Sequence, residues 1–126
     1  MLPKVSIVMA THNSIKYLEQ SVGSILSQKF DNFEFIIVDD GSTDNTLSEL
    51  KKINDSRVRI IHQNNQGQTN ALIKGVENTC GDLIARIDQD DYSLPNRLMR
   101  QVEFMDTHPK VILCGSRFQE LHNDKI

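Results

Sequence analysis

Three carboxylates stand within four residues in the segment Asp88-Gln89-Asp90-Asp91. The run before it, Asp82 to Ile87, is mostly apolar and has the length of a buried strand. Carboxylates crowded at a strand end repel one another and lose hydration, so they persist most readily where a cation, alone or carrying a phosphate, lies among them. A hydrated acidic turn is the alternative that these residues leave open.

Further polar groups follow other runs that have strand character. The runs are short and rich in β-branched and aromatic residues, as is typical of strands that are covered on both faces. They are Val5 to Ala10, Phe33 to Val38 and Val58 to His62. The polar segments that follow them are Thr11-His12-Asn13-Ser14, Asp39-Asp40 and Asn64 to Gln68.

The segments between these runs have the spacing of helices. Ile15, Leu18 and Val22 recur on one face of the first, which predicts a helix packed against a sheet. Further helices are expected near residues 45 to 54, around Ala71 to Val76 with Gly81 as a C-terminal stop, and after the cap and first-turn proline of Ser93-Leu94-Pro95. A fifth strand is expected at Val111 to Gly115, and Glu120 to Ile126 is expected to be a loop.

Alternating strands and helices predict an α/β fold with a mainly parallel sheet and helices on both faces. In such sheets, ligands collect at the carboxyl ends of the strands. All the polar segments named above fall at those ends, whereas independent surface turns need not share one edge. This convergence favours a ligand site over a hydrated turn.

Length and charge limit the possible partners. The 126 residues suit one domain, and 14 basic against 17 acidic residues, with no basic stripe, argue against nucleic acid. No apolar run reaches the about 18 residues of a membrane span, and no charged-then-apolar leader opens the chain. Cys80 and Cys114 have no metal-ligand spacing and fit reduced thiols of a cytoplasmic protein, although a disulfide between them stays open.

Specific residues exclude several nucleotide-binding families that share this architecture. A dinucleotide fold and a related nucleotidyltransferase need glycines after the first strand, where Thr11-His12-Asn13-Ser14 has none. No P-loop motif is present. A phospho-receiver domain places its acid pair after the first strand and a lysine after the fifth, whereas here the pair follows the second strand and Ser116-Arg117 follows the fifth.

The order of the motifs along nearly the whole chain resembles the family 2 glycosyltransferases with the three-layer, Rossmann-like GT-A fold. The resemblance implies transfer of a sugar from a nucleotide diphosphate donor, usually UDP-linked, to a hydroxyl acceptor, with inversion and with Mg²⁺ or Mn²⁺ at the diphosphate. The matching segments are Val5 to Asn13, Ile36 to Asp44, Gly67-Gln68 before Ala71-Leu72 and Gly75, Gly81-Asp82, and Ile87 to Asp91 with Pro95.

The resemblance also implies roles for single residues on the nucleotide side. Ala10, Thr11 and His12 match the segment that holds the base, with His12 where many relatives have a tyrosine; a solvated loop residue is its alternative. Asp40 matches the acid that accepts the imide N–H of uracil; the alternative is that it only caps a turn. Asp39 is interpreted as a local acceptor that organises the loop. Gln68 belongs to a further wall of the same donor pocket.

For the cation, the resemblance implies the Asp-X-Asp motif at Asp88-Gln89-Asp90. In it the first acid approaches the ribose or the metal, and the last binds the metal. Asp91 is expected outside the direct ligands or in the following turn. Ile73 replaces an asparagine found in many relatives, so that a donor contact is absent or is supplied by Asn70 or Lys74.

The chain is therefore interpreted as the donor-binding part, residues 1–126, of a GT-A glycosyltransferase domain, cut before its acceptor half. No catalytic base is assigned, and His62, His108 and His122 are interpreted as surface residues. The expected partners are a UDP-sugar and a saccharide or lipid-linked acceptor, and the family suggests work at the inner face of a membrane. A non-catalytic module that binds nucleotide or metal is the competing hypothesis.

Overall fold

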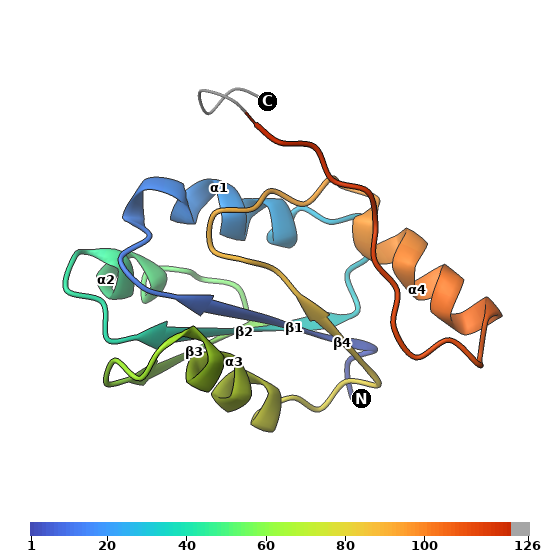
Figure 1. Cartoon of the computed structure of the whole chain (residues 1–126), viewed down its shortest axis with the longest axis horizontal. Helices are drawn as coiled ribbons and strands as arrows, with labels where there is room; N and C mark the ends of the chain where they lie inside the picture. Colours follow the sequence, from blue (N-terminus) through green and yellow to red (C-terminus); the bar gives the residue numbers. More distant parts are fainter. Residues whose placement is uncertain (122–126) are drawn as a thin grey trace.

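The computed structural model describes residues 1–121, and within them four strands alternate with four helices (Figure 1). The strands form one parallel sheet in the order β3-β2-β1-β4. This arrangement confirms the predicted α/β class. The elements are β1 (Val5–Thr11), α1 (Ile15–Leu26), β2 (Phe33–Asp40), α2 (Thr46–Leu50), β3 (Val58–Gln63), α3 (Gln68–Glu77), β4 (Leu83–Arg86) and α4 (Arg97–Thr107).

The two central strands are buried on both faces, because helices cover the sheet from both sides. In Figure 1, α1 lies on one side of the sheet and α3 on the other. Alternate residues of β2 divide between two apolar clusters: Phe35 packs in the cluster with Leu18 of α1, and Ile36 packs with Ala71 of α3. The larger cluster also takes in residues of α2 and α4, among them Leu50 and Leu98.

Two glycines have steric rather than capping roles. A Cβ on Gly75 would meet the side chain of Val8, so α3 can lie this close to the sheet only because Gly75 has no side chain. Gly81 was expected to stop α3, but the helix ends at Glu77 and Asn78 follows it. At Gly81 a Cβ would come within 2.7 Å of the backbone N of Ser6, so a close backbone approach excludes a side chain there.

Two other expectations about the second half of the chain are wrong. Ser93-Leu94-Pro95 precedes α4 without capping it, because the helix begins at Arg97 with Asn96 before it. Val111 to Gly115 forms no strand, and residues 108–121 contain neither helix nor strand. Strand propensity depends on a pairing partner, and this segment pairs with none in residues 1–121. Of the expected terminal loop, residues 122–126, including His122, lie outside the described part.

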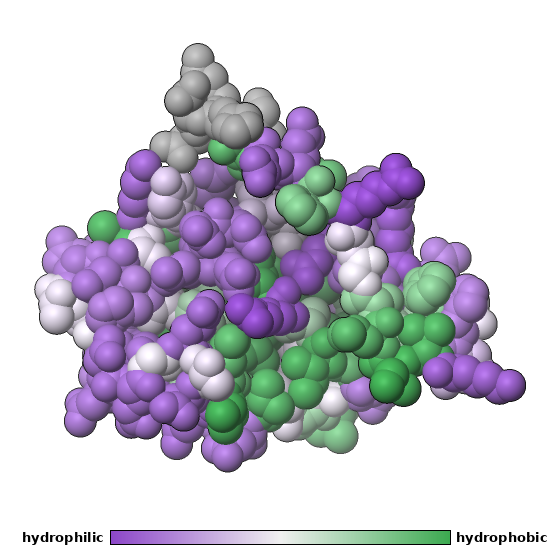
Figure 2. Space-filling model, viewed as in Figure 1, coloured by the Kyte–Doolittle hydropathy of each residue, from purple (hydrophilic) through white to green (hydrophobic). Residues whose placement is uncertain are grey.

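Apolar side chains remain exposed beside the sheet edge at β4. Leu83 and Ala85 pack toward the α1 side, so the alternation of the strand turns Ile84, 52% exposed, to the α3 side. Figure 2 shows hydrophobic residues gathered over this part of the molecule. Both cysteines are free thiols, and none of the helices in residues 1–121 is long and apolar enough to cross a membrane.

Candidate functional site

The carboxyl ends of the four described strands meet at one edge of the sheet, as the sequence predicted. The parallel register pairs Thr11 of β1 with Asp39 of β2, and Asp39 with His62 of β3. On the other side of β1, Val8 pairs with Arg86, the last residue of β4. The loops that follow these ends therefore start side by side, and the site is built from them.

Asp39 and Asp40 lie within β2, not after it as expected, so their side chains point to opposite faces of the sheet. Asp39 is fully buried. Its carboxylate accepts hydrogen bonds from the hydroxyl and backbone N–H of Ser42, and it contacts Nδ1 of His62 at 2.9 Å. Asp39 thus organises the turn after β2, in agreement with its interpretation as a local acceptor.

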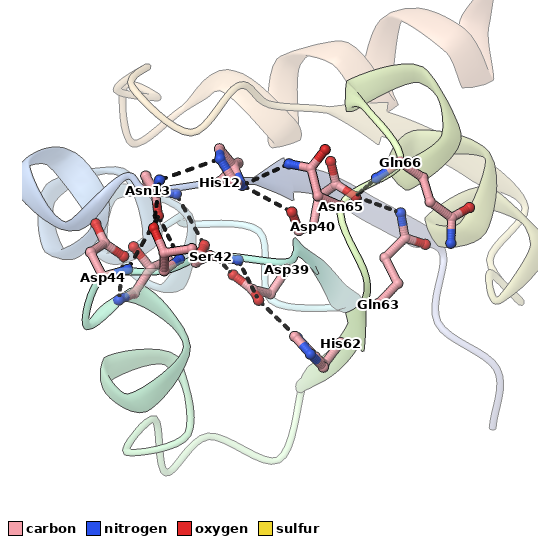
Figure 3. Close-up of polar contacts among 12 residues, drawn as sticks. His12, Asn13, Asp39, Asp40, Ser42, Asp44, His62, Gln63, Asn65 and Gln66 are labelled. Carbon is pink, nitrogen blue, oxygen red and sulfur yellow. Dashed lines mark hydrogen bonds and ion pairs between the residues drawn. The ribbon is translucent and has the colours of Figure 1, made fainter.

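The Asp40 carboxylate fixes the loop that leads into α3 (Figure 3). One oxygen accepts from Nε2 of Gln63 at 2.9 Å and from the backbone N–H of Gln66 at 2.8 Å, and the other accepts from the N–H of Gly67 at 2.9 Å. Burial opposes ionisation of Asp40, but these hydrogen bonds together outweigh it, so the pKa of Asp40 is lowered. A carboxylate has about four acceptor positions. Among the described residues, Oδ2 accepts one hydrogen bond where Oδ1 accepts two.

His12 joins the loops that follow three strands. Its Nδ1 lies 2.9 Å from the backbone oxygen of Asp40, which can only accept, so this nitrogen carries the proton. Its backbone N–H donates to Oε1 of Gln89 at 2.7 Å. Nδ2 of Asn65 lies 3.3 Å from the ring, as Figure 3 shows. The imidazole of His12 is therefore held at Asp40, and the His12 backbone is tied to the acid cluster.

Asn13 links the turn after β1 to the turn after β2. It adopts a left-handed conformation, with φ of 47°, which asparagine tolerates better than most residues. Its side-chain oxygen accepts from the backbone N–H groups of Thr43 at 2.8 Å and Asp44 at 3.3 Å. Its own N–H donates to the hydroxyl of Ser42 at 3.0 Å. These bonds fix the segment that presents His12.

The acid loop, defined here as Asp88 to Leu94, follows β4 at the same edge. Asp88 forms a 3.0 Å ion pair with Arg86, and both side chains are partly exposed. Asp90 and Asp91 are exposed. Lost hydration raises the pKa of Asp91, and the negative charges of Asp88 and Asp90 raise it further. The carboxylates therefore repel one another, and Asp88 and Asp90 are the candidates to hold a cation.

The other residues singled out in the sequence have smaller visible roles. Ala10 and Thr11 are buried, so neither presents its side chain at the surface. Gln68 is exposed and begins α3 directly after Gly67. Asn70 donates to the backbone oxygen of Gln66 at 2.8 Å, so it supports the Asp40 loop. A shallow open hollow of about 300 Å³ adjoins this loop, lined by His62, Gln63, Gln66, Asn70, Ile73, Lys74 and Glu77.

Three contributors to the site were missed in the sequence. Gln63 donates to Asp40, Asn65 lies beside the His12 ring, and Gln89 bridges to His12 from between Asp88 and Asp90. Only Gln63 had a usable signal, because the register of parallel strands pairs it with Asp40. Asn65 and Gln89 lie in loops, and contacts between loops that are distant in the chain produce no periodic pattern in the sequence.

Comparison with known proteins places the chain among glycosyltransferases. The family model described as glycosyl transferase family 2 matches residues 6–125. The putative glycosyltransferase EpsE of Bacillus subtilis is 41% identical over a 122-residue match that covers 90% of this chain and 42% of EpsE. A glycosyltransferase of Haemophilus influenzae is 35% identical over a 117-residue match that covers 90% of this chain and 36% of that protein.

Solved structures agree with these relatives. The crystal structure of S. aureus TarS in complex with UDP-GlcNAc superposes with a TM-score of 0.79 at 30% identity, over 84% of this chain and 32% of that one. The chain thus spans about a third to two fifths of the length of these relatives. The family match over residues 6–125, in agreement with the parallel sheet, shows that this chain belongs to glycosyltransferase family 2.

Proposed function

We propose that this chain is the donor-binding part of a glycosyltransferase that transfers a sugar from a UDP-sugar to a hydroxyl group of a saccharide or lipid-linked acceptor, with inversion. The observation that carries the proposal is the position of His12. It contacts the backbone oxygen of Asp40 at 2.9 Å and the side chain of Gln89 at 2.7 Å. A nucleotide base beside His12 and Asp40 then has its diphosphate directed toward Asp88 and Asp90.

The base is assigned to the side of the site formed by β1 and β2. The imidazole of His12 offers a flat face on which uracil can stack. The remaining acceptor position of the Asp40 carboxylate suits the imide N–H of uracil, and the lowered pKa of Asp40 keeps that acceptor ionised at neutral pH. TarS, which is 30% identical to this chain, binds UDP-GlcNAc in its crystal structure.

The acid loop fits a divalent cation. Carboxylate oxygens are the ligands that Mg²⁺ and Mn²⁺ prefer, and the mutual repulsion of Asp88, Asp90 and Asp91 is what a bound cation relieves. Within residues 1–121 no three His, Cys, Asp or Glu side chains gather into a metal site, so phosphate and water would complete the ligand set around Asp88 and Asp90. When bound by Asp88 and Asp90, such an ion would stabilise negative charge on the departing diphosphate.

The group that deprotonates the acceptor is assigned to the acceptor half of the whole protein. On α4, Asp106 forms a 2.9 Å ion pair with Lys4, which precedes β1 at the opposite edge of the sheet. Glu103 is exposed on the same helix. We therefore assign donor binding to residues 1–121: they hold the base, orient the diphosphate and keep the cation ligands in place.

Titration calorimetry of UDP, with Mn²⁺ and with EDTA, tests the proposal. The wild-type chain is expected to bind UDP in both conditions and more tightly with Mn²⁺. Asp90→Asn should lose about tenfold or more of the Mn²⁺-dependent affinity and keep the affinity measured in EDTA. Asp82→Asn is the matched control, because Asp82 is 77% exposed in its side chain and lies just before β4, at the other end of the strand from the acid loop.

Absence of UDP binding by a folded wild-type chain would overturn the proposal. Metal-dependent binding without transfer would favour the competing module that only binds nucleotide. Release of UDP from a UDP-sugar in the presence of a saccharide acceptor, measured on the protein that carries the acceptor half, separates these two cases.

A further inference from the structure

Three buried polar residues, two on α1 and one just past its C-terminal end, contact the acid loop. Ser21, Ser24 and Gln28 are 1%, 3% and 6% exposed. Ser21 and Ser24 lie on one face of α1, and Gln28 follows two residues after the helix ends at Leu26, with its Nε2 donating to the backbone oxygen of Ser24 at 3.1 Å. Polar groups are costly to bury unless they are hydrogen-bonded, so the partners of these side chains indicate what the stripe does. We call these three residues the polar stripe of α1.

The two serines bind the backbone at both ends of the acid loop. The hydroxyl of Ser21 donates to the backbone oxygen of Asp88 at 3.2 Å. The hydroxyl of Ser24 accepts from the backbone N–H of Ser93 at 3.0 Å and donates to the backbone oxygen of Ser21 at 2.7 Å. The first residue of the loop and its penultimate residue are thus tied to the same helix.

Gln28 makes the largest set of these contacts. Its Nε2 donates to the backbone oxygen of Leu94 at 2.7 Å, and it lies 3.3 Å from that of Ser93. Its Oε1 accepts from the backbone N–H of Leu98, in the first turn of α4, at 3.1 Å. A single buried amide therefore connects α1, the end of the acid loop and the start of α4.

The helix that carries the stripe is a rigid support. Leu18, Val22 and Ile25 of α1 are 5% exposed or less and pack in the large apolar cluster of the sheet. Between its fixed ends the acid loop leaves Asp90 exposed. The backbone of the loop is thus held at both ends while its carboxylates face solvent. This is the arrangement needed to present ligands to a cation without letting them relax apart.

We propose that Gln28, with Ser21 and Ser24, is a positioning residue for the cation ligands of the acid loop. The inference rests on the proposed function, because it assumes that Asp88 and Asp90 hold the cation. Gln28 is buried, and its amide bonds backbone groups at the end of the loop and the start of α4, so we assign it a positioning role and not a direct contact with a ligand. Its loss should therefore weaken the metal-dependent part of nucleotide binding and spare the part that depends on His12 and Asp40.

The experiment compares Gln28→Met, Ser24→Ala and the wild-type chain. Methionine nearly matches the shape of glutamine without its amide, and Ser24→Ala removes a single loop contact with little loss of volume. Ser27→Ala is the matched control, because the Ser27 hydroxyl is bonded to the backbone oxygen of Gly23 in its own helix. UDP affinity is measured by calorimetry with Mn²⁺ and with EDTA, and hydrogen exchange reports the protection of residues 88–94.

Gln28→Met is expected to lose Mn²⁺-dependent UDP affinity by about tenfold, with affinity in EDTA unchanged and faster exchange confined to the acid loop and the start of α4. Ser24→Ala should show a smaller loss of the same kind, and Ser27→Ala none. Equal Mn²⁺-dependent binding by a folded Gln28→Met, or an equal loss in EDTA and Mn²⁺ for both stripe variants, would overturn the positioning role. If the wild-type chain binds no UDP, the proposed function fails and this role fails with it.

Discussion

The backbone N–H of His12 donates a 2.7 Å hydrogen bond to Oε1 of Gln89, across 77 positions of sequence. This bond joins the loop after β1 to the acid loop after β4. Gln89 stands between Asp88 and Asp90, so the residue between the two acids of the motif contributes a contact of its own. The base side and the cation side of the proposed donor site are therefore mechanically connected.

Gln89→Ala should weaken this connection. The variant leaves the half-buried N–H of His12 without its partner, which costs about 1 kcal/mol of folding free energy. It should also lower the UDP affinity measured with Mn²⁺, because the acid loop loses its tie to His12. Urea unfolding and calorimetry measure the two effects. Gln20→Ala, on the exposed face of α1, is the control, and unchanged UDP affinity in Gln89→Ala would show that the bond has no role in binding.

His12 is predicted to act through its ring. His12→Ala should lower UDP affinity in EDTA by about tenfold, since stacking of a base on an aromatic side chain contributes about 1–3 kcal/mol. His12→Tyr keeps an aromatic face and should retain most of the affinity, although it loses the contact between Nδ1 and the backbone oxygen of Asp40. Calorimetry with UDP measures both variants. If the alanine and tyrosine variants bind equally, stacking is not the role of His12.

Much of the fold was predictable from sequence because its signals are local. The apolar runs at β1 and β2 identify buried strands, and the parallel sheet follows from their alternation with helices. The run at Val111 to Gly115 has equal apolar character but pairs with no strand in residues 1–121, and no local pattern reveals that. Strand propensity predicts which segments can pair, while pairing itself depends on distant residues.

The candidate site was predictable as a location but less so as a set of contacts. Parallel topology alone placed His12, Asp40 and Asp88 at one edge. The partners of these residues were not foreseeable, because Gln89 and the polar stripe of α1 act through backbone groups of other segments. Sequence alone does not identify hydrogen bonds between loops, since any polar side chain could make them.

An ion pair before β3 predicts a stability change in acid. Hydrogen bonds from Nε, Nη2 and the backbone N–H of Arg57, together with its charge, lower the pKa of Asp55 from its ordinary value of 3.8 to about 2. A carboxylate whose pKa is lower in the folded than in the unfolded state stabilises the protein at pH values above its unfolded-state pKa. This stabilisation is lost as the pH falls through its folded-state pKa. Asp55→Asn should therefore cost about 1–2 kcal/mol at pH 7 and much less near pH 2.

Urea unfolding at several pH values between 7 and 2 measures this difference. Asn54→Ala, an exposed neighbour in the same loop, is the control and should follow the wild-type pH dependence. A cost of Asp55→Asn that stays constant across this range would contradict the role of the ion pair.

Two glycines in helices should respond oppositely to the same substitution. Alanine is intrinsically better than glycine in a helix by about 1 kcal/mol. At Gly23 of α1 no atom lies within 4 Å of an added Cβ, so Gly23→Ala should stabilise the chain by roughly 0.5–1 kcal/mol. At Gly75 of α3 the Cβ meets buried Val8 and lies 3.4 Å from Val38, so Gly75→Ala should destabilise it by about 1–3 kcal/mol as α3 is pushed from the sheet. Thermal and urea unfolding measure both variants.

Because α3 carries the loop that Asp40 holds, Gly75→Ala should also weaken UDP binding, whereas Gly23→Ala should leave it unchanged. Stabilisation by both substitutions would show that α3 can shift away from the sheet at no cost.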